Sequence, residues 1–367
     1  MEERIGLDAG GNLVRLSWEG SQLVEVAPVQ GEPGRVFLLP LLVDIQVNGY
    51  AGGDFNAPDV RPEEVRAITR RLWREGVGYY CPTVTTGSRE RMLRSVRTIA
   101  AAWREFPEVA DSVLGVHVEG PFISPEDGPR GAHPREHVRP PSYQEYLDWQ
   151  EAAEGRVRIV TLSPEWPEAI SFIGRVAGEG VVVAIGHTAA EPERIREAVE
   201  AGARLSTHLG NGAHALLPRH PNYIWEQLAE DRLWASFIAD GHHLPFATLK
   251  AMLRAKGPER SVLISDAVRL AGMKPGRYPR LQRTGGGAAP QRTGAACRNP
   301  LPGRSRAPPS SWRCQRGTSH GVLPRRGGAD GLFQSRPVAG ASGRGQMVPR
   351  GPCQLHPGAV GRAARPP

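Results

Sequence analysis

The chain has little cysteine, no long apolar run and no sign of a secretory signal. Of its 367 residues only 4 are cysteines, and Cys81 alone lies in the first 278 residues. The remaining three, Cys297, Cys314 and Cys353, lack CxxC spacing, so neither a disulfide framework nor a thiolate metal site is supported. The longest apolar run, residues 36–43, includes a proline and is too short to cross a bilayer. The N-terminus lacks a charged-then-apolar pattern. We therefore expect a cytoplasmic protein that does not insert into membranes.

Residues 279–367 have almost no acidic side chains and no lysine. They contain 15 arginines against one acid, Asp330, although the whole chain carries a formal charge of only +8. The basic charge is therefore a property of this stretch and not of the preceding residues. Its richness in arginine, glycine and proline, without periodicity, predicts a disordered tail.

A shifted reading frame would produce such a tail. Codons that specify residues 333–337 can also give Asn-Pro-Ala when they are read one nucleotide later. The alternative is a genuine arginine-rich tail that binds RNA through its phosphates. Against this alternative, Trp312 and Phe333 are the tail's only aromatic residues, so stacking platforms are scarce. We do not expect nucleic acid to be a partner.

Residues 41–264 alternate short apolar runs with helical patterns, which favours parallel strands joined by helices. Eight such strands in about 240 residues predict an α/β fold, a (β/α)8 TIM-like barrel, with an open doubly wound sheet as the competing architecture. Short strands are also expected at 13–18, 23–27 and 36–39. The predicted barrel strands are 41–47, 79–84, 113–118, 157–162, 181–185, 204–209, 234–239 and 261–264.

Several of these strands end on residues with metal or acid–base chemistry. Glu119, His187 and His208 follow three different strands and form a set of one oxygen and two nitrogen ligands, which suits a divalent ion such as zinc. Asp266 follows the last strand, where it could accept and return a proton. Active sites of such barrels collect at this end of the strands. The pattern predicts metal-dependent hydrolysis of an amide. The alternative is a metal-free barrel with a polar rim.

Two loops at the same end carry further candidates. The long loop 120–133 is rich in glycine and proline, and its His133 could hydrogen-bond a substrate carbonyl. Asn211 and Gly212 follow the sixth predicted strand and could offer backbone amides to an anion, although an Asn-Gly pair is also a common turn.

These residues resemble the N-acetylglucosamine-6-phosphate deacetylase family of the amidohydrolase superfamily. The similarity covers about residues 1–278, and its most specific stretch is His117-Val-Glu-Gly-Pro followed by Gly131-Ala-His. The resemblance implies a partial β-sandwich at 1–39 and a metal-dependent amidohydrolase barrel at 40–278, with the tail at 279–367 outside the match. Further matching motifs are Asp44-Ile-Gln-Val-Asn-Gly, Gly186-His-Thr, Thr207-His-Leu-Gly-Asn, Ala239-Asp-Gly-His-His and Ser265-Asp-Ala.

The resemblance also implies roles for individual residues. Glu119, His187 and His208 would hold the metal, Asp266 would be the acid/base, and His133 would polarise the acetyl carbonyl. The reaction implied is hydrolysis of N-acetylglucosamine 6-phosphate to glucosamine 6-phosphate and acetate. An intact member is expected to be a homodimer. Residues expected to line the substrate site are His243, Asn211, Gly212, Arg219, Gln46 and Asn48.

The first barrel strand bears on the metal count. Many amidohydrolases have two histidines there, whereas this chain has Gln46 and Asn48, as in single-metal deacetylases. We therefore expect one divalent ion, zinc first, with iron, manganese or cobalt as alternatives.

The chain departs from the family pattern at residues 210–225, in a loop that helps to read the phosphate. This departure leaves open a sibling amidohydrolase that acts on another N-acyl sugar or a cyclic amide. A second departure is the tail, which replaces the segment that should close the barrel. An inactive product with a poorly closed barrel is therefore the alternative of another class.

Overall fold

The computed structural model describes residues 1–32, 34–274, 276 and 278. Residues 1–41 form one compact unit, and the described residues from Leu42 onward form a second. The predicted tail, 279–367, lies outside the described residues. The assignment of 1–39, 40–278 and 279–367 as three domains of stated kinds stays a prediction.

The first unit contains a three-stranded antiparallel sheet in the order β1-β2-β3. Its strands are β1 (Glu2–Leu7), β2 (Leu13–Glu19) and β3 (Gln22–Pro28). The sequence predicted the second and third of these but missed β1, whose Glu-Glu-Arg start hides the apolar alternation. The strand predicted at 36–39 is wrong: this segment makes only an isolated bridge between Phe37 and Leu7.

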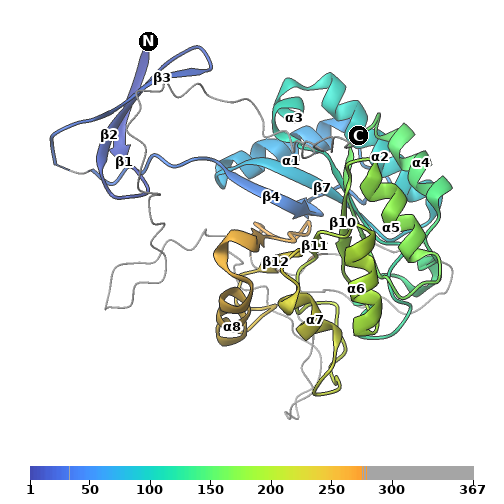
Figure 1. Cartoon of the computed structure of the whole chain (residues 1–367). Coiled ribbons are helices and arrows are strands. Elements are labelled where there is room, and N and C mark those ends of the chain that lie inside the picture. The colour runs from blue at the N-terminus through green and yellow to red at the C-terminus, as the bar shows by residue number, and fades with distance from the viewer. Residues whose placement is uncertain (33, 275, 277, 279–367) are drawn as a thin grey trace, which may run out of the picture. The chain divides into compact units, whose positions relative to one another are not determined.

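The second unit is the predicted barrel, with eight strands in one sheet (Figure 1). All neighbouring strands pair in parallel, which confirms the (β/α)8 architecture. The strands are β4 (Leu42–Val47), β7 (Val77–Thr85), β8 (Val116–Glu119), β9 (Val157–Leu162), β10 (Val182–Ile185), β11 (Leu205–Ser206), β12 (Trp234–Ile238) and β13 (Ser261–Ile264). A short antiparallel pair, β5 (Gly49–Tyr50) and β6 (Gly53–Asp54), follows β4.

The seam between the first and last barrel strands is closed at its carboxyl end. Val47 and Ala267 form a parallel bridge, the Asp266 amide donates to the Gln46 carbonyl at 3.0 Å, and the Asn48 amide donates to the Ala267 carbonyl at 2.8 Å. The expectation of a poorly closed barrel is therefore wrong at this end, because backbone hydrogen bonds that follow β13 replace a longer strand pairing.

Helices lie outside the barrel strands, as expected from the helical patterns between the predicted strands (Figure 1). Proline occupies the first turn of α1 and α6, and Ser88 and Ser142 cap α2 and α4 with their side-chain oxygens. The sequence analysis did not predict the short helix α3, which ends at Ser112, and β8 begins at Val116, three residues later than predicted. Among the described residues no helix is long and apolar enough to span a bilayer.

The helices are α1 (Pro62–Arg74), α2 (Arg89–Glu105), α3 (Pro107–Ser112), α4 (Tyr143–Ala152), α5 (Ala169–Gly178), α6 (Pro192–Ala201), α7 (Tyr223–Ala229) and α8 (Phe246–Lys256), with 3₁₀ turns at Arg135–His137 and Pro258–Arg260.

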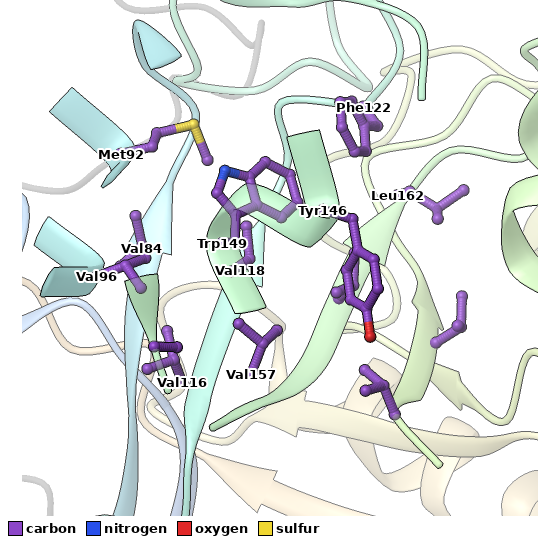
Figure 2. Close-up of a cluster of buried hydrophobic side chains, with 14 of the residues drawn as sticks. Val84, Met92, Val96, Val116, Val118, Phe122, Tyr146, Trp149, Val157 and Leu162 are labelled. Atoms are coloured by element: carbon purple, nitrogen blue, oxygen red, sulfur yellow. The ribbon is translucent and has the colours of Figure 1, made fainter. Parts of the chain in front are cut away.

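The core between strands and helices fixes the loop that follows β8. Phe122, in that loop, is fully buried and stacks on Trp149 of α4 with ring centroids 5.1 Å apart. It also meets Phe172 of α5 edge-on at 5.4 Å. Figure 2 shows Phe122 and Trp149 above the valines of the neighbouring strands. The apolar core thus holds the start of a loop whose polar residues face the barrel mouth.

Candidate active site

Three of the predicted site residues share an unusual backbone conformation at the carboxyl ends of strands. His187, His208 and Asp266 have φ values of 51°, 31° and 47°. Residues with a β-carbon rarely adopt this left-handed region, and such strain concentrates at functional sites. In each case the chain turns sharply as it leaves the strand.

Glu119 lies at the centre of the site. Its side chain is buried, and its Oε1 lies 2.9 Å from His208 Nε2, 3.3 Å from His187 Nε2 and 2.8 Å from Gln46 Nε2. Burial alone would raise the pKa of Glu119, but the hydrogen bonds and charges of the two histidines hold it well below its usual range. The site therefore keeps an ionised carboxylate in a buried position.

Contacts on the far side of the rings orient His187 and His133. His187 Nδ1 donates to the Pro129 carbonyl at 2.8 Å, which fixes the ring with its Nε2 on the side of Glu119. His133 Nδ1 contacts Thr86 Oγ1 at 2.7 Å, and its Nε2 lies 3.2 Å from His187 Nε2. Both rings therefore present Nε2 to the same small volume.

Two glycines make room for the His187 ring. A β-carbon on Gly212 would lie 2.5 Å from His187 Nδ1, and one on Gly131 would lie 3.2 Å from His187 Cε1. Both glycines also have positive φ, at 56° and 57°. The loops that follow β8 and β11 therefore both pack against His187, and neither position tolerates a side chain without displacing the ring.

The donor set fits a divalent cation. Glu119, His133 and His187 place their ligand atoms within 4.8 Å of one another, and His208 Nε2 adds a fourth donor 2.9 Å from Glu119. This geometric group contains His133, whereas the sequence prediction chose His208 as the third ligand. His208 Nδ1 is buried without a hydrogen-bond partner, so no contact on that side selects its tautomer. A buried carboxylate with converging imidazoles is a typical zinc environment.

Asp266 lies beside this cluster, where two amide side chains hold it. Its Oδ1 accepts from Asn48 Nδ2 at 2.7 Å and from Gln46 Nε2 at 3.2 Å. Burial, together with the charge of Glu119, raises the pKa of Asp266 to about 6. A carboxyl group in this range can both accept and release a proton near neutral pH. Gln46 thus links Asp266 to Glu119.

The remaining predicted residues lie on the loops around the mouth. Asn211 Nδ2 donates to the His208 carbonyl at 3.2 Å. His243 Nδ1 donates to Asp240 Oδ2 at 2.8 Å, and this carboxylate raises the pKa of His243. Arg219 uses its carbonyl to accept from Trp225 Nε1 at 3.1 Å.

Sequence reasoning missed a polar chain across the barrel interior below Glu119. His117 Nδ1 donates to the Ile45 carbonyl at 3.0 Å, so its Nε2 accepts from Thr161 Oγ1 at 2.8 Å. Thr161 in turn contacts Thr207 Oγ1 at 2.7 Å. The signal was available, because His117 and Glu119 are two residues apart on one strand and therefore share a face.

No family model matches the chain, but known proteins are similar to it in sequence and in fold. The N-acetylglucosamine-6-phosphate deacetylase of Bacillus subtilis is 34% identical over 249 residues, which are 67% of this chain and 62% of that protein. The N-acetylgalactosamine-6-phosphate deacetylase of Escherichia coli O157:H7 is 35% identical over 257 residues, 70% of this chain and 66% of that one. A Mycobacterium smegmatis N-acetyl-D-glucosamine-6-phosphate deacetylase variant, solved with N-acetyl-D-glucosamine 6-phosphate, superimposes with a TM-score of 0.63 at 31% identity and covers 72% of this chain and 69% of that chain.

The barrel and its converging glutamate and histidines define an amidohydrolase-type enzyme fold. Within that class the chain belongs to the N-acetylglucosamine-6-phosphate deacetylase family. The match spans a little under two thirds of the length of the curated relatives.

Proposed function

We propose that the protein hydrolyses the N-acetyl amide of N-acetylglucosamine 6-phosphate to glucosamine 6-phosphate and acetate. The observation that carries this proposal is the convergence of Glu119, His187 and His208 beside Asp266 at one end of a parallel barrel. The family relationship supplies the substrate class, since named relatives act on N-acetylated amino-sugar phosphates.

Glu119, His187 and His208 are the proposed ligands of one divalent ion, with zinc as the first expectation. When bound, such an ion would supply Lewis acidity towards the acetyl carbonyl and lower the pKa of water towards about 7. The tautomer of His187, fixed by the Pro129 carbonyl, gives its Nε2 the lone pair that a metal ligand needs.

Asp266 is the proposed proton carrier. It takes a proton from the water that attacks the acetyl carbon and gives it to the amide nitrogen as the carbon–nitrogen bond breaks, so acetate and a free amine leave. Asn48 and Gln46 hold its Oδ1 through their amide groups, and Oδ2 is left for this exchange. His133 orients the carbonyl by hydrogen bonding.

The sugar phosphate is proposed to lie over the loops that follow β11 and β12. Asn211, the Gly212 amide, Arg219 and His243 are its proposed contacts. The departure at residues 210–225 and the galactosamine-type relative favour one second candidate, the N-acetylgalactosamine 6-phosphate epimer. A homodimer in the cytoplasm is the proposed state of the enzyme.

The test is acetate release by the purified full chain, combined with elemental analysis. We expect about one divalent ion per chain and turnover of N-acetylglucosamine 6-phosphate above that of its epimer and of the unphosphorylated sugar. Asp266→Asn should keep the ion but lose at least ~10²-fold in kcat. Asp231→Asn, at an exposed aspartate that pairs with Arg260, is the matched control. Absence of a bound ion, or near-normal turnover of Asp266→Asn in an active chain, would contradict the proposal.

A further inference from the structure

A contact between two loops crosses the barrel mouth and is not used by the proposed reaction. Glu126 lies in the loop after β8, and His214 lies in the loop after β11. His214 Nε2 and Glu126 Oε2 are 3.0 Å apart. Tyr223, the first residue of α7, contacts the other ring nitrogen of His214, with its hydroxyl 3.0 Å from Nδ1. We call Glu126, His214 and Tyr223 the mouth latch.

The donors and acceptors of the mouth latch can be assigned in one consistent way. Glu126 Oε2 can only accept, so Nε2 of His214 carries a hydrogen. In a neutral ring Nδ1 then accepts the single hydrogen of the Tyr223 hydroxyl, whose oxygen accepts from the backbone N–H of His214 at 2.8 Å. Each member of the mouth latch therefore fixes the next, and the imidazole has both nitrogens satisfied.

The two loops also touch through their backbones. A β-carbon on Gly128 would lie 3.1 Å from His214 Cα and 3.2 Å from the Ala213 carbonyl oxygen. Only a glycine with positive φ, here 98°, permits this approach. Within three residues of this contact, Gly131 of the first loop and Gly212 of the second both lie against the His187 ring. The mouth latch thus lies at the outer edge of a contact that reaches the proposed ligand.

Each loop carries one end of the proposed substrate site. His133, the proposed acetyl contact, ends the first loop, and Asn211 and Gly212, the proposed phosphate contacts, begin the second. Binding one small substrate at both ends requires a fixed separation between the loops, and ordering them in advance lowers the cost of binding.

We propose that His214 is a positioning residue: through Glu126 and Tyr223 it fixes the loops after β8 and β11 at the separation that an N-acetylated amino-sugar phosphate spans. The inference rests on the proposed function for the identity of the substrate. Its structural part, that His214 joins the loops, stands apart from that function. His214 lies in the segment where this chain departs from the family pattern.

The structural part is tested by hydrogen exchange on the full chain without substrate. Glu126→Ala changes a side chain that is 59% exposed, so folding should not depend on it. We expect amides of residues 209–222 to exchange at least ~10-fold faster in this variant, although the change is in the other loop. His214→Ala should speed exchange in both loops. Asp127→Ala is the matched control, because Asp127 pairs with Arg130 within its own loop and should leave 209–222 unchanged.

The functional part is tested by steady-state kinetics with N-acetylglucosamine 6-phosphate. We expect Glu126→Ala and His214→Ala to raise KM at least ~5-fold with kcat within ~2-fold, and the double variant to be no worse than the worse single variant. Glu126→Gln should restore most of the loss, because its carboxamide oxygen still accepts from Nε2.

Unchanged exchange in 209–222 for Glu126→Ala, or strictly additive effects on KM in the double variant, would overturn the proposal. If the variants change amide exchange as expected but the wild-type chain releases no acetate, the proposed function is refuted and the contact between the loops remains established.

Discussion

At the scale of single residues, the barrel interior holds a carboxyl group that the proposed chemistry does not use. Asp44 of β4 is buried, and its oxygens accept from the backbone N–H groups of Gln46 at 3.1 Å and Ser265 at 3.2 Å. Burial raises the pKa of Asp44 to about 6, against the lowering effect of these hydrogen bonds. Because Ser265 follows β13, Asp44 also ties the two strands of the seam together.

The raised pKa predicts a pH-dependent contribution to stability. A group whose pKa is higher in the folded state binds more protons there, so its contribution is complete below the unfolded value of 3.8 and is lost as pH rises through about 6. Relative to wild type, the free energy of unfolding of Asp44→Asn should therefore rise by roughly 2 kcal/mol between pH 4 and pH 7. Urea midpoints measured at several pH values check this. Asp231→Asn is the control, and a constant difference for Asp44→Asn would show that Asp44 does not titrate in this range.

At the scale of elements, a buried ion-pair network anchors the segment that follows the first mouth loop. Glu145 of α4 is 2% exposed and accepts from Arg139 Nε at 3.0 Å and from Arg89 Nε of α2 at 3.1 Å. Arg139 also donates to the Gly87 and His137 carbonyls at 3.0 and 2.7 Å. The network joins two helices to the chain that leaves His133.

Removing the buried carboxylate of this network should lower the free energy of unfolding more than removing its exposed arginine. Glu145→Ala would leave Arg139, which is 21% exposed, without its carboxylate, and we expect a loss of about 3 kcal/mol in the free energy of unfolding. Arg89→Ala should cost about 1 kcal/mol or less, because Arg89 is 62% exposed and Glu145 keeps its other partner. Urea denaturation of both variants checks the difference. Equal losses would mean that the Arg89 pair accounts for the whole effect and that the pair with Arg139 contributes nothing.

Much of this architecture could be predicted because the signals are local. Proline at helix starts and apolar strand runs located α1, α6 and all eight barrel strands. Strand-end positions alone brought Glu119, His187, His208 and Asp266 into one region. The link that Gln46 makes between Glu119 and Asp266 could not be predicted, because it joins side chains 73 and 220 residues apart in the sequence. The bridge at Phe37, where a strand was expected, depends likewise on tertiary pairing with Leu7.

At the scale of the molecule, the described residues join the seam of the barrel by hydrogen bonds but place no helix over its outer face. Val43 of β4 and Leu263 of β13 are 49% and 57% exposed. Side chains alternate along a strand, and Asp44 and Gln46 face inward, so Val43 faces outward. In the other strand–helix units a helix packs over the outward face, whereas the described residues after β13 form no helix. Within the described part of the chain, the apolar face of the seam therefore lacks the helix that covers the other strands.

Restoring the alternative reading frame after residue 278 should stabilise the chain. In the family pattern that segment supplies the barrel-closing helix, and burying the exposed halves of Val43 and Leu263 would contribute about 1 kcal/mol for each side chain. We expect a higher melting temperature, weaker binding of a hydrophobic dye and more acetate release than from the present chain. Truncation after Tyr278 is the control and should match the present chain in stability, because residues 279–367 have few large apolar side chains to bury. If truncation instead lowers the melting temperature, residues 279–367 stabilise the barrel themselves, and the reading-frame account must be given up.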